Sequence, residues 1–473
     1  MTQTLTIDPV TRLEGHGKIT IQLDNQGQVA DAHFHVTQVR GFERFSQGRP
    51  FYEMPSLMAR ICGICPVSHL IASAKACEAI MSVRIPHTAA QLRRMLNLAQ
   101  MVQSHALSFF YLASPDLLLG MESDPAARHV FGVVNAKPEL GRAGIGLRRF
   151  GQHIIELLGN KRIHPGWVVP GGVTEPLDPA KRDEILASMP EAFANIRLAL
   201  AAYKQIADTF KPEIEVFANF PSNYMSLINE DESIEFTDGA LRMIDPQGTI
   251  LDDGISASRF SDVIGEAVEP YSYTKFAYYK PLGYPEGSYR VGPLARLNIV
   301  KSMGTPLAEK ELAEFKQLAA GPVQSSFHYH HARLIEMLYG IEKIEQILTD
   351  PLILDKHVRA SAGVNRLEGA GQAEAPRGTL MHHYKVDENG LITWANLVIA
   401  TGQNNNAMNK GVLQAAREYV KDGKFTEGTL NRVEAVIRTF DPCLSCSTHA
   451  FGQMPLVLSL LSSEGDVVDQ VVR

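Results

Sequence analysis

The sequence predicts an α+β fold, with a single large body, a central bundle of long helices and peripheral antiparallel β units. Two observations predict the bundle and the β units: apolar residues recur at helical spacing over several long stretches, and alternating segments are few and bounded by turn residues. A third predicts the single body, because no internal repeat, low-complexity tract or flexible linker divides the 473 residues into modules.

Composition narrows the class of protein. The chain has 45 Lys and Arg against 52 Asp and Glu, a net charge of -7, and an apolar fraction of 45%, as in soluble globular proteins. It has no basic run or basic/aromatic stripe, which argues against a nucleic acid partner. No uninterrupted apolar segment approaches the ~18 residues of a membrane span, and no secretory signal opens the chain. We expect a cytoplasmic protein, exported only with a partner that carries a signal.

The first expected element is an antiparallel β unit over residues 4–37. Residues 18–23 alternate, residues 25–27 (NQG) form a turn and residues 29–36 return. The charged segment RLEGH, residues 12–16, interrupts the first strand. It is followed by RGFERF, residues 40–45, in which Glu43 lies between aromatic residues.

Helices are expected to dominate from Pro66 onward, because proline is favoured in the first turn of a helix. Pro190 lies inside one helical pattern and predicts a break or kink there. The helical stretches are 68–81, 89–119, 142–158, 182–210, 327–348 and 408–420. Residues 216–300 are mixed, with strand-like pieces around 248–255 and 289–291, and residues 378–400 read as a hairpin with a turn at 387–390.

Two short cysteine pairs stand near opposite ends of the chain. Cys62 and Cys65 form the first CxxC, Cys443 and Cys446 form the second, and Cys77 alone lies outside them. The short spacing of a CxxC brings two sulfurs within reach of one ion. The two pairs therefore predict a four-thiolate metal site, provided that the fold brings the distant segments together.

Both pairs are expected at helix starts. Cys65 directly precedes Pro66, and Asp441-Pro442 reads as N-cap and first helical residue, which would place Cys443 and Cys446 in the first turn. Because a helix N-terminus favours negative charge, we expect these thiols to be acidic and ready to bind metal as thiolates.

Three kinds of site fit the cysteine pattern: a structural zinc site, a catalytic transition-metal site and a pair of redox thiols. Zinc modules usually separate their cysteine pairs by a few tens of residues, whereas 378 positions separate Cys65 from Cys443. His69, four residues after Cys65, and His449, three after Cys446, can each donate a hydrogen bond to a sulfur. Such donors tune a reactive metal, although a lone histidine is more often an ordinary residue.

The motifs together resemble those of nickel–iron hydrogenase large subunits, most closely the cytoplasmic, bidirectional, NAD(P)-linked group. The resemblance spans nearly the whole chain. The segments that carry it are RICGICPVSH, DPCLSCSTHA, SHALSFFYLASPD, RLEGH at 12–16, RGFE at 40–43 and EAPRG at 374–378.

The resemblance implies a nickel ion held by Cys62, Cys65, Cys443 and Cys446. Cys65 and Cys446 would bridge it to an iron that carries carbon monoxide and cyanide. The implied reaction is reversible heterolytic cleavage of dihydrogen, with Glu14 relaying the proton. From its residue type alone, Glu14 would be a solvated carboxylate.

Further roles follow from the same resemblance. Arg377 would stand over the open metal position and bind a cyanide, with Pro376 beside it and Asp116 further out, while Thr401 would bind the other cyanide. By itself, Arg377 reads as a surface or ion-paired residue. A second site for magnesium or a similar ion would use Glu43, the backbone carbonyl of Leu397, and His449, although histidine is an uncommon ligand for such an ion.

The chain cannot carry the electrons to a nicotinamide by itself. With four cysteines at the metal only Cys77 remains, which reads as ordinary core, whereas an iron–sulfur cluster ordinarily takes four. No GxGxxG motif follows a strand, and the glycine run at 141–146 has the wrong spacing. We therefore expect a hetero-oligomer in which a small iron–sulfur subunit works with flavin/NAD(P) diaphorase subunits.

The family resemblance divides the chain into a large-subunit domain, residues 1–450, and a C-terminal extension, residues 451–473. In such proteins a maturation protease removes the extension after nickel-insertion proteins have loaded the metal. The extension also reads simply as a permanent C-terminal strand.

Three rival functions share some of these features. One is a hydrogen-sensing subunit, which carries the same motifs without bulk turnover. The second is the related subunit of respiratory quinone reductases, which lacks the four cysteines. The third is a scaffold held together by zinc.

Overall fold

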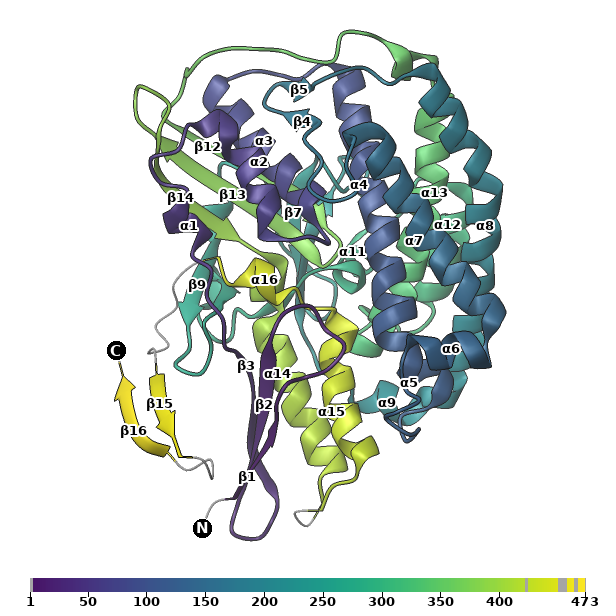
Figure 1. Ribbon diagram of the computed structural model, residues 1–473, viewed down its shortest axis with the longest axis vertical. Coiled ribbons are helices and arrows are strands. Elements are labelled where there is room, and N and C mark those ends of the chain that lie inside the picture. Colours follow the sequence, from purple (N-terminus) through teal and green to yellow (C-terminus); the bar gives the residue numbers. More distant parts are fainter. Residues whose placement is uncertain (1–2, 422–423, 450–456, 463–466, 473) are drawn as a thin grey trace.

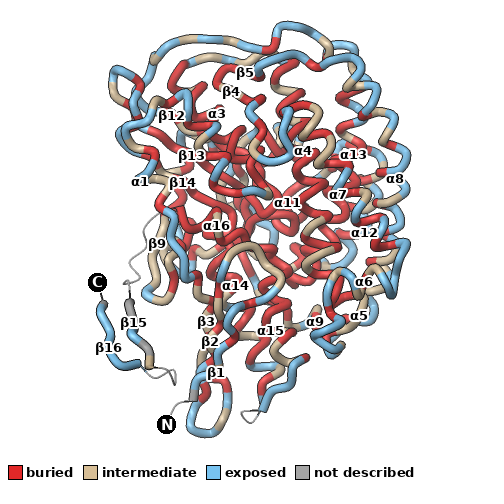
Figure 2. Tube along the Cα trace, viewed as in Figure 1, coloured by how far each residue is buried: buried red, intermediate tan, exposed pale blue. Residues whose placement is uncertain are grey.

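The computed structural model describes residues 3–421, 424–449, 457–462 and 467–472, and its architecture is the α+β body expected from the sequence (Figure 1). Four long helices pack side by side: α4 (His87–Leu107) contacts α7 (Pro138–Gly159) and α13 (Tyr329–Thr349), and α8 (Pro179–Ala207) contacts the same two. Most of the sheets lie to one side of this bundle (Figure 1), whereas the short helices α6 and α12 pack against it. The buried residues run continuously through both parts (Figure 2).

The remaining helices are short, apart from α3, α14 and α15. They are α1 (Phe42–Phe45), α2 (Met54–Met58), α3 (Pro66–Met81), α5 (Ser114–Leu119), α6 (Val130–Ala136), α9 (Lys211–Val216), α10 (Phe260–Val263), α11 (Pro293–Ile299), α12 (Pro306–Lys316), α14 (Ala400–Tyr419), α15 (Glu427–Phe440) and α16 (Leu444–Ser447).

The strands form several small sheets. The sheets are β1–β2–β3 (Gln3–Ile7, Gly17–Leu23, Val29–Val36), β4–β5 (Val168–Val169, Gly172–Val173), β11–β6–β7–β8 (Tyr289–Arg290, Asn223–Ile228, Ala240–Ile244, Ile250–Ile255), β10–β9 (Lys275–Tyr279, Ile264–Val268), β12–β13–β14 (Glu368–Ala375, Gly378–Val386, Ile392–Val398) and β15–β16 (Val457–Leu461, Val467–Val472). Every pairing is antiparallel except that of β11 with β6.

The N-terminal β unit and the later hairpin are confirmed. In β2, the alternate residues Ile19, Ile21 and Leu23 are buried, as the alternating pattern predicts. The predicted turn at 387–390 joins β13 to β14, where the Asp387 carboxylate accepts from the N–H groups of Asn389 and Leu391.

Each predicted helical stretch is helical in the structure, with differences at some boundaries, whereas α15 and several short helices were not predicted. The stretch 89–119 is interrupted by a π-helical turn, Ser108–Ala113, before α5 begins. A break or kink was expected at Pro190. The break does not occur, since α8 continues through this exposed residue.

Helix α14 begins at Ala400, eight residues before the expected start at 408. Its first turns are rich in asparagine, which has a low helix propensity. Buried partners compensate: Asn404 accepts from the Val291 N–H, and Asn405 donates to Thr274. Tertiary hydrogen bonds therefore extend a helix that the local sequence disfavours.

Strand β12 was missed because its sequence, EGAGQAEA, lacks β-branched and aromatic residues. Its glycines allow α3 to lie against it. A Cβ at Gly371 would meet the Ala72 carbonyl oxygen at 2.2 Å, and one at Gly369 would meet the Ala76 oxygen at 2.3 Å. A step of two residues along β12, from 369 to 371, corresponds to a step of four residues along α3, from 76 to 72. This close packing holds α3, whose N-cap is Cys65, in place.

Among the described residues, the stretch Pro179–Val216 is long and apolar enough, by length and composition alone, to cross a membrane. In the structure it is part of the helical body, because α8 packs against α7 and α13.

Gly371→Ala should destabilise the protein, because the new methyl group meets the backbone of α3, which cannot move aside. Overpacking of this kind costs about 1–3 kcal/mol, so the thermal unfolding midpoint should fall. Gly363→Ala is the matched control, since a Cβ there meets nothing within 4 Å. Equal midpoints for the two variants would contradict the packing account.

Candidate metal centre

The two cysteine pairs meet in one buried site. Cys62 Sγ lies 3.4 Å from Cys443 Sγ, Cys65 Sγ lies 3.4 Å from Cys446 Sγ, and the sulfurs of Cys443 and Cys446 are 2.8 Å apart. All four sulfurs lie within 4.8 Å of one another, and all four residues are buried. Four soft ligand atoms at this spacing can surround a single transition-metal ion.

Local backbone geometry places each sulfur. Cys65 is the N-cap of α3, as predicted, and the N–H groups of Ile64 and Cys65 point at Cys62 Sγ, at 3.2 and 3.4 Å. Cys443 has an extended conformation and caps α16, the central short helix in Figure 1, which contains Cys446. The second pair therefore stands at a helix start, but that start is two residues later than predicted.

The prediction that Asp441 is the N-cap of the second cysteine helix is wrong. Asp441 is the C-cap of α15, a helix that the sequence analysis did not identify, and it has a left-handed backbone with φ 53°. Aspartate tolerates this conformation better than most residues. Asp441 therefore ends one helix instead of beginning the next.

The RLEGH segment packs directly against the second cysteine pair. Glu14 forms a parallel bridge with Cys443, and its carbonyl accepts from the Leu444 N–H at 3.1 Å. Gly15 has φ +89°, and a Cβ there would lie 2.6 Å from Leu444 Cβ, so only glycine fits. The half-buried Glu14 carboxylate accepts from the Ser445 N–H at 3.0 Å and from the Ser445 hydroxyl. Ser445 is inside the CxxC, where no pattern indicated its role.

The expectation of acidic thiols is confirmed for Cys62 and wrong for Cys65, Cys443 and Cys446, whose pKa values are raised. Hydrogen bonding to the other thiols, Cys443 first, holds the pKa of Cys62 well below its usual value. Burial raises the pKa values of Cys443 and Cys446 well above theirs, because α16 is too short to offset the desolvation of a thiolate. A bound cation would supply the missing compensation.

His69 contacts the sulfur of Cys446, at 3.5 Å from Nε2, and not that of Cys65. A buried chain continues from it. His69 Nδ1 lies 3.1 Å from His382 Nε2, His382 Nδ1 lies 2.5 Å from Tyr384 Oη, and Tyr384 donates to Ser73 at 2.9 Å. Burial lowers the pKa of His69 to about 4, so its ring is neutral at pH 7. The sequence alone did not indicate His382 or Tyr384.

Arg377 lines the same small cavity as Cys65, Cys443 and Cys446. Its Nε donates to the Asp441 carbonyl at 2.5 Å and its Nη2 to the Asp441 carboxylate at 3.1 Å, while Nη1 is buried with no hydrogen-bond partner among the described residues. Thr401 accepts from the Cys443 N–H at 2.9 Å, so its hydroxyl hydrogen remains to be donated. The complete lining is Cys65, His69, Ala375, Arg377, Leu380, Ile399, Ala400, Thr401, Cys443 and Cys446.

Asp116 does not line this cavity. It accepts from Arg12 at 2.5 Å, from Asn431 at 2.9 Å and from Arg438 at 3.0 Å. Burial alone would raise the pKa of Asp116, but the positive charges of Arg438 and Arg12 hold this pKa below its usual value. The Asp116 carboxylate thus connects the RLEGH segment to α15. Pro376, the other residue expected beside Arg377, directly precedes it in the chain.

Glu43, His449 and Leu397 converge nearby. The Leu397 N–H donates to Glu43 Oε1 at 2.8 Å, and the Glu43 N–H donates to the His449 carbonyl at 3.1 Å. His449 Nε2 lies 3.5 Å from Glu43 Oε1, and its Nδ1 contacts the Cys446 carbonyl and not a sulfur. Lys275, which the sequence did not indicate, lies 3.5 Å from Glu43.

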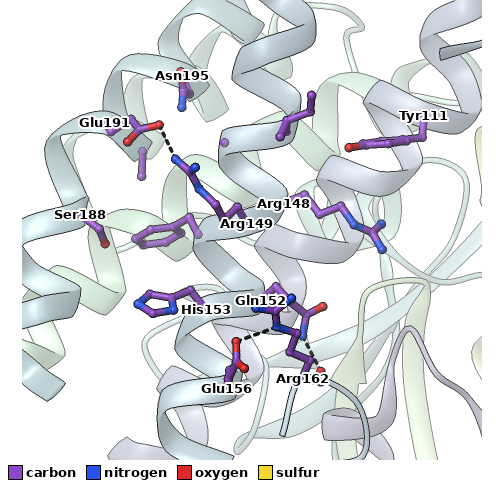
Figure 3. A pocket seen from close by; sticks show the side chains of 14 residues that line it. Tyr111, Arg148, Arg149, Gln152, His153, Glu156, Arg162, Ser188, Glu191 and Asn195 are labelled. Atoms are coloured by element: carbon purple, nitrogen blue, oxygen red, sulfur yellow. Dashed lines mark hydrogen bonds and ion pairs between the residues drawn. The ribbon is translucent and has the colours of Figure 1, made fainter. Parts of the chain in front are cut away.

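A larger pocket, about 520 Å³, lies elsewhere, between α7 and α8 (Figure 3). Four of its charged side chains form two ion pairs, Arg149 with Glu191 and Arg162 with Glu156, while Arg148 lies over the Tyr111 ring. No residue that the sequence singled out lines it, so its size alone does not make it the functional site.

Family models match much of the chain. Residues 40–126 and 259–449 match a family described as nickel-dependent hydrogenase, and residues 4–39 match a model described as HoxL-like.

Curated relatives match over nearly their full lengths. The chain is 42% identical to the NAD-reducing hydrogenase HoxS subunit beta of Cupriavidus necator over all of both chains, and 40% identical to a subunit of the F420-non-reducing hydrogenase vhc of Methanococcus voltae over 98% of each. A solved NAD+-reducing [NiFe]-hydrogenase in the H2-reduced state superimposes with a TM-score of 0.92 at 44% identity, covering 95% of this chain and 100% of that one. The Ni-Fe-Se hydrogenase of D. vulgaris Hildenborough, at 24% identity and a TM-score of 0.73, shares the fold.

Cys446→Ser should abolish metal uptake, because a hydroxyl is a poor replacement for a soft thiolate ligand. The measurement is the nickel and iron content of the purified protein. Cys77→Ser makes the same chemical change at a buried cysteine that donates to the Phe51 carbonyl, outside the cluster, and should leave metal content unchanged. Full nickel loading of the Cys446 variant would contradict the assignment of this sulfur as a ligand.

Proposed function

The chain belongs to the nickel-dependent hydrogenase family, and we propose that it is the catalytic subunit of a reversible hydrogenase that exchanges electrons with NAD(P) through partner subunits. The observation that carries the proposal is the convergence of the two cysteine pairs on one buried point. The match of the family model to residues 40–126 and 259–449 includes both pairs.

The residues present fit a nickel–iron group. Cys62, Cys65, Cys443 and Cys446 would hold this group, and its iron is proposed to carry carbon monoxide and cyanide. When bound, the group supplies the electrophilic site at which dihydrogen is split heterolytically. The buried and unpartnered Nη1 of Arg377 and the hydroxyl of Thr401 are donors suited to the cyanides.

The side chains around the sulfurs control access to the site. Ala375, Leu380 and Ile399 give the cavity an apolar wall, which keeps water away from the reacting groups. The Asp441 carboxylate and carbonyl hold the Arg377 guanidinium in place, so its remaining N–H groups have a fixed direction.

Glu14 is the proposed proton relay. Its backbone pairs with Cys443 and its carboxylate is held by Ser445, while the side chain is half-buried. A carboxylate at this boundary can take a proton from the thiolate site and pass it outward.

Electrons must leave through another chain. Only Cys77 remains beyond the four ligands, too few for an ordinary iron–sulfur cluster. Gly63, which lies between Cys62 and Cys65, is exposed, as is Arg60 just before them. This surface is where a small iron–sulfur subunit could bring a cluster close to the site, and flavin/NAD(P) diaphorase subunits would follow.

NAD(P) is favoured as the acceptor because the relative named NAD-reducing and the solved NAD+-reducing enzyme both match at more than 40% identity over almost the whole chain. F420-non-reducing relatives match nearly as well, so the acceptor needs a direct test. A complex that reduces NAD(P) with dihydrogen supports the proposal, and one that does so only with other acceptors contradicts it. A hydrogen-sensing role would instead show a low turnover and a signalling partner.

The proposed compartment is the cytoplasm.

Magnesium is proposed for the second site. Glu43 would supply a carboxylate and Leu397 its carbonyl, both hard oxygen ligands. His449 fits as a third ligand, because its Nε2 is buried with no hydrogen-bond partner in the described part of the chain, and burial lowers its pKa to about 4. The site would anchor the last residues before the extension.

The extension, residues 451–473, is proposed to be removed on maturation. The boundary with residues 1–450 falls outside the described residues. Beyond it, β15 and β16 form a hairpin that lies apart from the body in Figure 1, with Leu460 and Val468 exposed.

Glu14→Gln should leave metal content unchanged and suppress hydrogen–deuterium exchange between gas and solvent, because the amide still accepts from Ser445 but cannot carry a proton. Exchange at the wild-type rate would remove the relay role from Glu14. Glu53→Gln, at an exposed glutamate remote from the described cavity lining, is the matched control and should change neither quantity.

Truncation after Ala450 should block nickel loading if the extension serves maturation. The measurement is nickel content after expression with the nickel-insertion proteins and the maturation protease. A truncated chain that loads nickel normally would show that the extension has no part in metal insertion.

A further inference from the structure

Four side chains of α3 and β13 form a buried chain of hydrogen bonds that starts at the sulfur of Cys446. His69 and Ser73 stand about one turn apart on α3, so they lie on the same side of that helix. His382 and Tyr384 are two residues apart on β13 and share the strand face that packs against α3. The matching spacings set the two histidine rings against each other, and the Tyr384 hydroxyl against that of Ser73.

The contacts along this chain are unbroken. The distances are 3.5 Å from Cys446 Sγ to His69 Nε2, 3.1 Å from His69 Nδ1 to His382 Nε2, 2.5 Å from His382 Nδ1 to Tyr384 Oη and 2.9 Å from that oxygen to Ser73 Oγ. His69 is 1% exposed and the other three side chains belong to residues that are fully buried. Bulk water therefore cannot replace any of these hydrogen bonds.

Both histidine rings in the chain are neutral. Among the described residues, neither ring has a carboxylate as a hydrogen-bond partner. Burial lowers the pKa of each ring, that of His69 to about 4. A neutral ring has one protonated nitrogen, which donates, and one bare nitrogen, which accepts. Because every contact needs one proton, the position of one ring proton fixes the position of the other.

The chain is complete in either of two directions, since both hydroxyls can rotate to donate or to accept. In the first, Tyr384 donates to Ser73 and every proton points away from Cys446, whose sulfur must then donate as a thiol. In the second, Ser73 donates to Tyr384 and every proton points toward Cys446, whose sulfur accepts as a thiolate. The second direction puts the proton of each histidine on Nε2.

We propose that His382 and Tyr384 are positioning residues of the metal centre, because they hold His69 in the tautomer that donates from Nε2 to the bound sulfur. The inference deepens the proposed function and rests on it, since Cys446 as a metal ligand is a thiolate and can only accept. Its consequence is electronic. An N–H donor draws electron density from the sulfur, and hydrogen bonds to thiolate ligands of this kind tune the metal toward a higher reduction potential.

The first test locates the ring protons directly. Nitrogen NMR of isotope-labelled histidine, in a diamagnetic state of the mature complex, distinguishes a protonated ring nitrogen from a bare one. His69 and His382 should each carry the proton on Nε2 and leave Nδ1 bare. A proton on Nδ1 of either ring would overturn the proposal.

The second test uses the infrared band of the iron-bound carbon monoxide. His382→Met removes the donor to His69 and should shift this band to lower frequency, because a more electron-rich metal donates more density into the ligand. His382→Gln places an amide N–H near the position of Nε2 and should return the band toward its wild-type frequency. Tyr384→Phe should shift the band in the same direction as the Met variant but by less, since His382 keeps its nitrogen and loses only the group that fixes its tautomer.

His383→Gln is the matched control. This ring lies between His382 and Tyr384 in the sequence but points to the other face of β13, where it pairs with Glu368 at 2.7 Å. Its replacement should leave the band unchanged.

The outcomes separate this inference from the proposed function. A wild-type complex without carbon monoxide and cyanide bands refutes the proposed function. Normal wild-type bands that do not move in the Met variant overturn the positioning role alone. Equal shifts in the Met and Gln variants overturn it too, because the shape of the side chain and not its N–H group would then set the band. If the Met variant does not load metal, the ring protons of the wild type decide.

Discussion

The structure depends on bringing four sulfurs from distant parts of the chain to one buried point. Each pair is held by a different set of contacts. The first depends on α3, which lies so close to β12 that glycine is required at 369 and 371. The second depends on the RLEGH segment, where Gly15 lets the backbone of residues 14 and 15 lie against Cys443 and Leu444. These contacts bring together two segments that are nearly four hundred residues apart in the sequence.

The chemistry of the pocket follows from its burial. Without a cation, desolvation raises the pKa values of Cys443 and Cys446, so the protein part alone stabilises thiols there. The surrounding groups favour a bound, electron-rich metal centre instead. Arg377, which is held by Asp441, has a buried N–H group with no partner among the described residues. Sites that bind and react commonly carry such local costs, which the well-packed remainder of the molecule offsets.

Much of the architecture could be predicted from local patterns. The N-terminal strands alternate clearly, and the long helices have continuous apolar faces. The elements that were missed depend on tertiary contacts. The glycines and alanines of β12 carry no strand signal until α3 packs on them, and the asparagines at the start of α14 become helical through buried partners. Asp441 looks like an N-cap beside Pro442, whereas its left-handed backbone ends α15.

The same limit applies to the site. The cysteines, Glu14 and Arg377 were found through motifs, but which sulfur His69 contacts depends on how α3 and α16 approach each other.

The most direct test of the account is X-ray absorption at the nickel edge of the mature protein. The account predicts nickel surrounded by four sulfur atoms with iron as a near neighbour. Nickel bound mainly by nitrogen and oxygen, or a protein that contains only zinc, would contradict it.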